Sequence, residues 1–291
     1  MLTNKLMRIT DELICSLFRQ VAGLYSLAMH EFAFVFAGFA VGLVVGLTGV
    51  GGGSLMTPLL IFVFGIKPHL AIGTDLLFAA FTKMGGTISL ARARVIDWRI
   101  VGQVAAGSIP ATLVTLFMLQ RLGPADPATQ SVMTTTLGVA LLLTAVATLF
   151  KALRGKAAPT RIAPELLEQA TRARHWALPV LFGAVIGALV TLTSVGAGAI
   201  GVIVLIMLYP ALPLPRIVAA DIAHAVPLTL VAGLGHASIG SVDWPLLAKL
   251  LAGSLPGIWL GTYLMHKTPD RVIRSLLSVL LAYAGAKLIS L

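Results

Sequence analysis

Charged residues are scarce in this chain. Asp, Glu, Lys and Arg make up 11% of its 291 residues, whereas an ordinary soluble domain carries about 25%. Hydrophobic residues make up 58%, and the mean hydropathy is +0.97. They stand in runs of about 20 rather than in the alternating ten-residue segments of a membrane β-barrel. The composition excludes a water-soluble domain and predicts an all-α polytopic membrane protein.

Cysteine is nearly absent as well. Cys15 is the single cysteine, which excludes an intramolecular disulfide and a cysteine-based metal cluster. The sequence has no His-Glu-x-x-His metal motif, no Gly-x-Ser-x-Gly nucleophile elbow and no P-loop. We therefore expect neither an enzyme nor an ATP-driven pump, and we expect no cofactor and no bound metal.

Basic residues outnumber acidic ones, 21 to 11, which gives a net charge of +10. They stand in short segments between apolar runs, so we expect contact with the lipid bilayer and not with nucleic acid. The positive-inside rule places the polar linker at 151–176 in the cytoplasm, and the protein in the inner membrane as a multi-pass protein. Six basic residues mark this linker: Lys151, Arg154, Lys156, Arg161, Arg172 and Arg174.

The apolar runs divide the chain into two halves. Residues 1–31 precede them and predict either an amphipathic helix on the membrane surface or a disordered leader. Repeat 1 covers residues 32–150 and repeat 2 covers residues 177–291, with four hydrophobic segments in each. These segments run at roughly 32–64, 70–90, 100–119, 131–150, 177–208, 216–238, 245–264 and 272–291.

The two halves match each other at a near-constant distance, which predicts an internal duplication. Gly49-Val50-Gly51 matches Ser194-Val195-Gly196 at an offset of 145. The three other matches have an offset of 146: Thr74-Asp75 with Ala220-Asp221, Val95-Ile96-Asp97-Trp98 with Ser241-Val242-Asp243-Trp244, and Gly107-Ser108-Ile109-Pro110 with Gly253-Ser254-Leu255-Pro256.

The first segment of each repeat is too long for one span and contains a glycine-rich stretch, where we expect the helix to break. If the broken segment crosses the bilayer once, the repeats are parallel. If it forms a re-entrant hairpin, they are inverted. The loop at 92–99 is basic and its counterpart around Asp243 is not, while the loop at 266–274 is more basic than its counterpart around Arg121. This opposite bias favours inversion, although the total charge count leaves both arrangements open.

A series of short motifs carries a resemblance to a known family. Repeated in the second half, the series resembles the sulfite exporter TauE/SafE family of permeases over residues 32–291. In order, these motifs are the glycines of residues 49–53 followed by Pro58, Ala71-Ile-Gly-Thr74, Val95-Ile-Asp97-Trp98, and Gly107 with Pro110.

The resemblance implies a secondary carrier built by duplication. It would export sulfite or a related organic anion such as a sulfonate or sulfoacetate. The sequence departs from the family pattern in two places. The second glycine cluster is thinned to Gly196-Ala197-Gly198, and Asp75 and Asp221 stand where serine is expected.

The broken segments are the predicted substrate site. Glycine lets backbone N–H groups approach an anion, and a helix N-terminus adds partial positive charge. Close helix packing through small residues is the alternative explanation for the glycines. The predicted substrate-binding residues are Thr48, Gly49, Gly51, Gly52, Gly53, Ser54, Thr193, Ser194, Gly196 and Gly198.

Charged residues within the spans predict coupling to protons. A carboxylate at membrane depth is costly and is usually functional or paired. We assign proton coupling to Asp75, Asp221 and His224, with helix capping as the alternative for the two aspartates. Lys83 either attracts the anion or snorkels to the interface, and His236, near the end of its span, is expected at the interface. Asp97 and Asp243 are expected to cap helices.

Three other functions compete with a carrier. An anion channel would share the glycine-lined site but would need no coupling residues. An intramembrane enzyme lacks its motifs here, and a scaffold without flux would not need matched glycine breaks.

Overall fold

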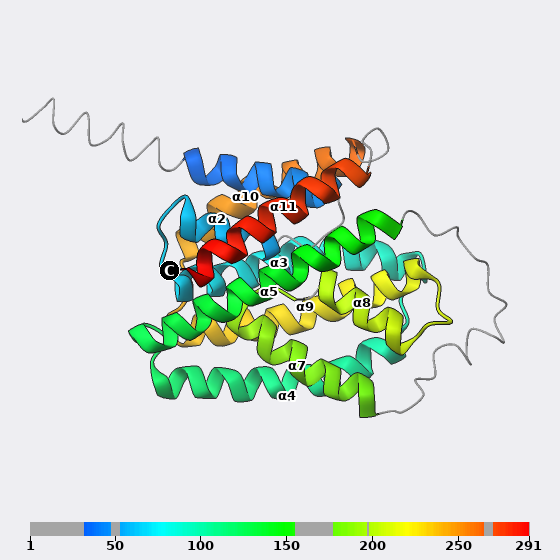
Figure 1. Cartoon of the computed structure of the whole chain (residues 1–291), viewed down its shortest axis with the longest axis horizontal. Coiled ribbons are helices and arrows are strands. Elements are labelled where there is room, and N and C mark those ends of the chain that lie inside the picture. Colours follow the sequence, from blue (N-terminus) through cyan, green and yellow to red (C-terminus); the bar gives the residue numbers. More distant parts are fainter. Residues whose placement is uncertain (1–31, 48–52, 155–176, 197, 265–269, 291) are drawn as a thin grey trace, which may run out of the picture.

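The computed structural model describes residues 32–47, 53–154, 177–196, 198–264 and 270–290. Helices and the turns that join them make up this part of the chain, with no strand in it (Figure 1). The all-helical prediction is confirmed there. Residues 1–31 and most of the linker lie outside it.

The helices follow the predicted apolar segments. The first helix is Phe32–Leu47, and the other four of the first half are α2 (Gly53–Phe62), α3 (Pro68–Arg92), α4 (Trp98–Leu122) and α5 (Pro127–Arg154). The second half contains α7 (Ala177–Thr193), α8 (Ala199–Leu208), α9 (Leu214–Ser238), α10 (Trp244–Leu264) and α11 (Asp270–Ile289).

Local chemistry sets several of these boundaries. Pro68 begins α3 at a position where proline costs no hydrogen bond. The Asp97 carboxylate accepts bonds from the backbone N–H groups of Arg99 and Ile100, at 3.1 and 3.4 Å, and so caps α4. Asp243 accepts from Leu246 N–H at 3.0 Å at the start of α10. The predicted capping role of both aspartates is confirmed.

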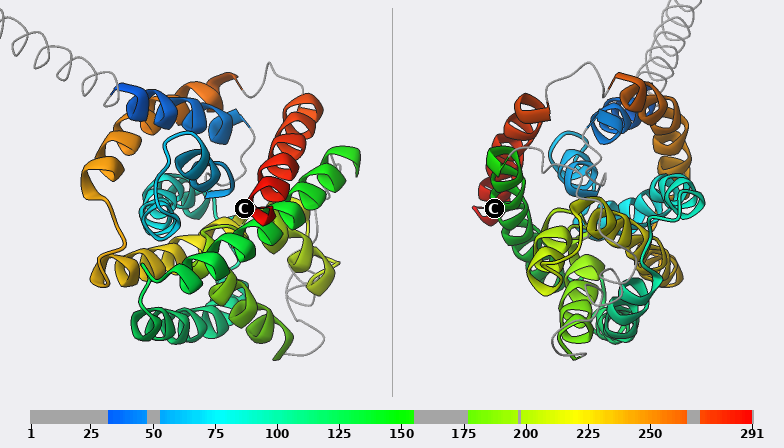
Figure 2. Two further views of the ribbon diagram at one scale, coloured as in Figure 1. Left: turned by 60° about the vertical axis from the view of Figure 1, so that its left-hand side comes forward. Right: turned by 90° about the vertical axis from the view of Figure 1, so that its right-hand side faces the viewer.

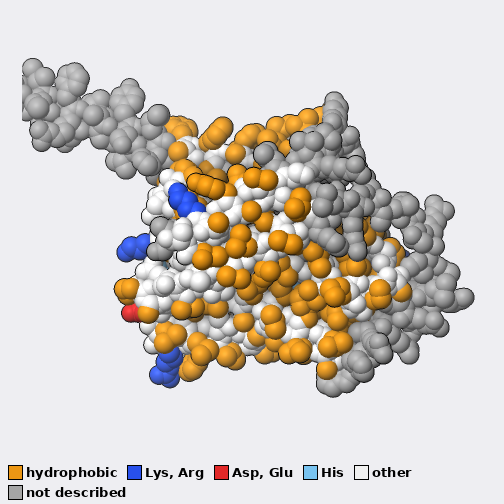
Figure 3. Space-filling view, in the orientation of Figure 1, with side chains coloured by type: hydrophobic (Ala, Val, Ile, Leu, Met, Phe, Trp, Pro, Cys, Tyr) orange, Lys and Arg blue, Asp and Glu red, His pale blue; other side chains and the backbone are white. Residues whose placement is uncertain are grey.

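Apolar side chains cover much of the outer surface. Three of the described helices, Trp98–Leu122, Pro127–Leu149 and Leu214–Ser238, are long and apolar enough to cross a membrane. Figure 3 shows hydrophobic side chains over the face in view, with Lys, Arg, Asp and Glu gathered at one end. Such a large exposed apolar surface is what a surrounding bilayer requires.

The helix pair α3 and α9 forms the interior of the protein. A Cβ atom at Gly73, early in α3, would lie 1.9 Å from the carbonyl oxygen of Ser241, which follows the end of α9. A Cβ at Gly233, late in α9, would lie within 3.0 Å of Leu77. The start of α3 therefore lies beside the end of α9, and the two helices are antiparallel.

The outer helices pair across the two halves of the chain. Gly107 of α4 packs on Val180 of α7, and Gly253 of α10 packs on Val35 of the first helix. Helix α5 packs along α11. Figure 2 shows the result: the first helix lies beside α10 and α5 lies beside α11, so the halves interleave and do not form separate lobes.

The close approach of α4 to α7 predicts a strong cost for adding one methyl group. A Cβ at Gly107 would lie 1.8 Å from the Val180 carbonyl oxygen, while a Cβ at Gly102 on the same helix would meet nothing within 4 Å. Overpacking costs about 1–3 kcal/mol, so Gly107→Ala should lower the midpoint of thermal unfolding in detergent by about 3 °C or more. Gly102→Ala is the control. Equal midpoints for the two variants would contradict this packing.

Candidate functional site

The chain is not helical between α7 and α8. Helix α7 ends at Thr193 and α8 begins at Ala199, with positive φ angles of 58° at Ser194 and 131° at Gly196. The Thr193 hydroxyl donates to the Leu189 carbonyl at 2.6 Å and accepts from Val195 N–H at 3.1 Å. Ser194 and Gly196 are buried and Gly198 is half-buried. Irregular backbone at this depth is tolerated because protein surrounds it.

The first glycine-rich stretch falls mostly outside the described residues. Thr48, Gly49, Gly51 and Gly52 are not described. Gly53 begins α2, and the Ser54 side chain after it is 6% exposed.

Asp75 lies fully buried in α3 and receives a hydrogen bond from α2. The Thr57 hydroxyl donates to its Oδ2 at 2.5 Å. The Ser194 side chain, from the segment between α7 and α8, lies next to the same carboxyl group. Asp75 is the eighth residue of its helix, so helix capping does not explain it.

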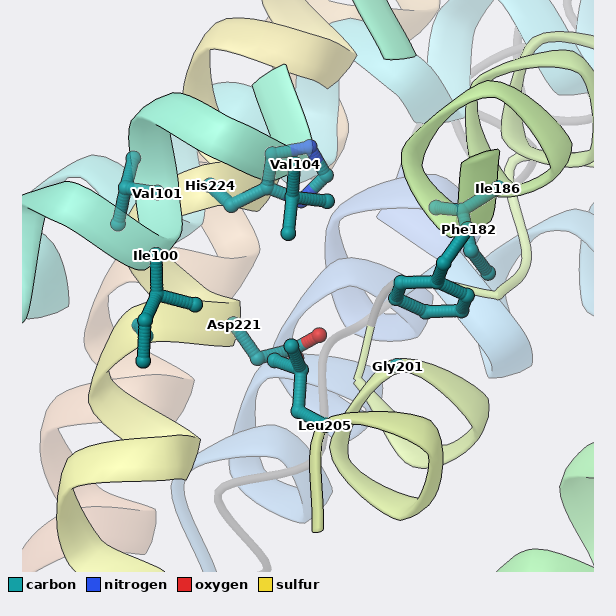
Figure 4. Close-up of a pocket in the computed structure, with 10 residues that line it drawn as sticks. Ile100, Val101, Val104, Phe182, Ile186, Gly201, Leu205, Asp221 and His224 are labelled. Atoms are coloured by element: carbon teal, nitrogen blue, oxygen red, sulfur yellow. The ribbon is translucent and has the colours of Figure 1, made fainter. Parts of the chain in front are cut away.

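Asp221 lies in a narrow cleft between α4, α7, α8 and α9 (Figure 4). Asp221 is 3% exposed and, like Asp75, is the eighth residue of its helix. A Cβ at Gly201 would lie 2.1 Å from its Oδ1, so the carboxylate lies directly against the α8 backbone. Apolar side chains of α4 and α7, such as Val104 and Phe182, form the opposite walls. The cleft leaves no water-sized space, so a ligand can enter only if its walls move.

His224 follows Asp221 by one helical turn and lines the same cleft. Its Nε2 lies 2.8 Å from the Ser108 hydroxyl of α4, and both side chains are buried. In the sequence, Ser108 stands out only as part of a matched motif. Its contact with His224 results from the packing of α4 on α9, which the sequence does not reveal.

Lys83 lies within electrostatic range of these groups. Its side chain is half-buried in α3, two turns after Asp75, and its charge interacts with Asp221 and with Asp75. It also acts on His224. Because α3 and α9 are antiparallel, the second half of α3 lies alongside the first half of α9, where Asp221 and His224 stand. One cation therefore serves two carboxylates that come from different halves of the chain.

Comparison with known proteins gives one family. The sulfite exporter TauE/SafE family matches residues 34–288. The chain belongs to this family. It is 37% identical to the probable membrane transporter protein YjnA of Bacillus subtilis, over 88% of this chain and 98% of that protein. It is 31% identical to the probable membrane transporter protein YdhB of the same organism, over 86% and 97%. No solved structure matches the chain.

Membership confirms the resemblance that the motifs carried, and it identifies the chain as a helical membrane protein of a transporter family. The names of its TauE/SafE relatives describe transporters and not enzymes. Within the described residues, the fold brings together five residues singled out from the sequence: Asp75, Lys83, Ser194, Asp221 and His224. Thr193 instead uses its hydroxyl to hold the turn after α7.

His236, which was expected near the membrane interface, lies in the last turn of α9. Its side chain is fully buried, and its Nε2 lies 2.9 Å from the Thr191 carbonyl oxygen. The start of α3 and the end of α7 cover this part of α9. Position near a helix end did not reveal that other helices enclose it.

The hydrogen bond from Thr57 predicts that this hydroxyl matters more than an ordinary buried threonine. Losing the partner of a buried carboxyl group costs about 1–3 kcal/mol or more, so Thr57→Val should lower the unfolding midpoint measurably. The control is Thr144→Val, because Thr144 is equally buried but donates only to the carbonyl oxygen of its own helix at Ala140. Thermal unfolding in detergent measures both. A larger loss in Thr144→Val would contradict the assigned bond.

Proposed function

We propose that this protein is a secondary active transporter that exports sulfite or a related organosulfur or organic anion, such as a sulfonate or sulfoacetate, across the inner membrane. Protons are the proposed coupling ion. The single observation that carries the proposal is Lys83, a half-buried cation whose charge interacts with both Asp75 and Asp221. Intramembrane ionisable groups are rare and usually mark the path of a substrate or an ion.

The proposed site lies between two inverted repeats. Asp75 and Asp221 are each the eighth residue of matched helices, and those helices are antiparallel. The first helix packs on α10 in the way that α7 packs on α4. A two-fold axis in the membrane plane generates such an exchange of partners. Helices α2 and α8 have ten residues each, half the length of a span, which suits re-entrant hairpins.

The two aspartate sites are unequal under this duplication. An offset of 145 or 146 matches Met56 and Phe78, in the first half, with Gly201 and His224 in the second. Met56 and Phe78 are fully buried in one apolar cluster, whereas Gly201 and His224 line the cleft beside Asp221. We therefore assign proton coupling to Asp221 with His224, beside the cleft, and to Asp75, whose surroundings are the more closely packed.

Lys83 links the anion to the proton. Its charge can compensate either a carboxylate or a bound anion, because a buried charge needs a partner of opposite sign. Protonation of an aspartate would release Lys83 for the anion. The N-terminus of α8, which follows Gly198, and the Ser194 hydroxyl offer hydrogen-bond donors nearby. Occupancy of the site by a proton and by an anion is therefore linked.

Counterflow in proteoliposomes tests the proposed function. Vesicles loaded with sulfite, sulfoacetate, thiosulfate or lactate in turn are diluted into a trace of the same labelled anion, with and without an imposed pH gradient. A carrier accumulates label transiently and saturably, and the gradient changes net flux. A channel gives flux without counterflow. Exchange of none of these anions would overturn the proposed substrate class.

Asp221→Asn is expected to remove the effect of the pH gradient on net flux, because the asparagine amide cannot take up a proton near neutral pH. The matched control is Asp243→Asn, since Asp243 caps α10 and asparagine caps a helix equally well. Initial rates at several imposed gradients measure the effect. Gradient dependence that persists in Asp221→Asn would remove Asp221 from the coupling mechanism.

A further inference from the structure

A second buried polar cluster lies at the other end of the α3 and α9 pair. His69 is the second residue of α3 and is 7% exposed, and His236 is the third residue from the end of α9 and is fully buried. A Cβ at Gly73 would lie 3.1 Å from the His236 Cβ and 1.9 Å from the Ser241 carbonyl oxygen. His69 precedes Gly73 by one helical turn, so the two histidines lie at the same end of the helix pair.

The hydrogen bond of His236 fixes which of its nitrogens carries a proton. Its Nε2 lies 2.9 Å from the Thr191 carbonyl oxygen, which can only accept, so Nε2 must carry a hydrogen. The neutral ring then presents a bare lone pair at Nδ1. That atom is buried and has no hydrogen-bond partner in the described part of the chain, and the same is true of His69 Nδ1.

Two such nitrogens at the same end of the helix pair need an explanation. A buried polar atom without a partner costs about 1–3 kcal/mol. The Ser241 hydroxyl, which belongs to the residue that packs on Gly73, is a third atom of this kind. Buried polar atoms without a partner mark strain, a catalytic role, or a place where water or an ion binds. The lone pair at His236 Nδ1 suits a proton better than an anion, because an anion needs donors.

The neighbours of the pair show where it lies. The charged group that acts on His69 is Lys67, and the Gln130 amide lies beside the same ring. Lys67 stands just before α3, where the chain leaves the helix bundle. On the inner side, Thr191 precedes Ser194 by one helical turn, and Ser194 lies next to Asp75. The pair therefore stands between the end of the bundle and the buried carboxyl group.

We propose that His69 and His236 form a proton-binding site through which Asp75 exchanges protons with the membrane face opposite the Asp221 cleft. His236 takes up the proton at Nδ1 and later gives up the same proton, while Nε2–H stays bonded to Thr191. The basic loop that contains Arg92, Arg94 and Arg99 follows the far end of α3, so this pair lies on the non-cytoplasmic side. The inference rests on the proposed proton coupling.

His236→Gln separates this role from a purely structural one. Glutamine keeps an N–H donor for the Thr191 carbonyl group but cannot carry a proton. With radiolabelled sulfite as the probe, sulfite counterflow without a gradient should stay within about twofold of wild type, while net flux driven by a pH gradient should fall roughly tenfold or more, as expected for loss of a proton-transfer group. His69→Gln should behave in the same way. His236→Leu, which loses both the donor and the proton site, is the comparison.

Each other result has a definite meaning. If His236→Gln retains wild-type gradient dependence, the inference is wrong. If His236→Gln and His236→Leu lose counterflow equally, His236 only holds α7 in place and the inference is again wrong. If wild-type protein shows sulfite counterflow but no gradient dependence, the proposed coupling fails first. If wild-type protein shows no counterflow of sulfite, the proposed substrate is wrong. The inference is also wrong if a pH indicator inside wild-type vesicles detects no proton movement.

Discussion

Buried charge is the constraint on which the rest of the structure depends. Asp75 and Asp221 are almost completely enclosed, and a carboxylate in such surroundings is costly unless a counter-charge or hydrogen-bond donors compensate it. Lys83 lies within electrostatic range of both carboxylates, because α3 and α9 are antiparallel and in direct contact. The close glycine contacts of the outer helices enclose this charged centre and separate it from lipid.

The break between α7 and α8 belongs to the same centre. The Thr193 hydroxyl accepts a hydrogen bond from the backbone of this segment, and the side chain of Ser194, the following residue, lies next to Asp75. Helix α8 then begins and brings Gly201 against Asp221. One short segment thus contacts both carboxylates. Any movement of that segment therefore changes the surroundings of both carboxylates.

The sequence predicted the helices well and the neighbours of their side chains poorly. The apolar run at 216–238 predicted the helix Leu214–Ser238 closely, because the length of the run and the positions of prolines can be read directly from the local sequence. Asp97 was recognised as a cap for the same reason. The Ser108–His224 pair and the burial of His236 depend on which helices meet, and hydropathy contains no such information. Asp75 does not cap α3, because that helix already begins at Pro68.

The matched halves carry different chemistry at matched places. Under the proposed duplication, Lys83 corresponds to Thr229, so the shared cation comes from one half only. Met56 and Phe78 are fully buried in one apolar cluster, whereas the matched residues Gly201 and His224 line the cleft beside Asp221. This asymmetry gives the two aspartates different neighbours, so a duplicated position in the two halves can serve different steps of the proposed cycle.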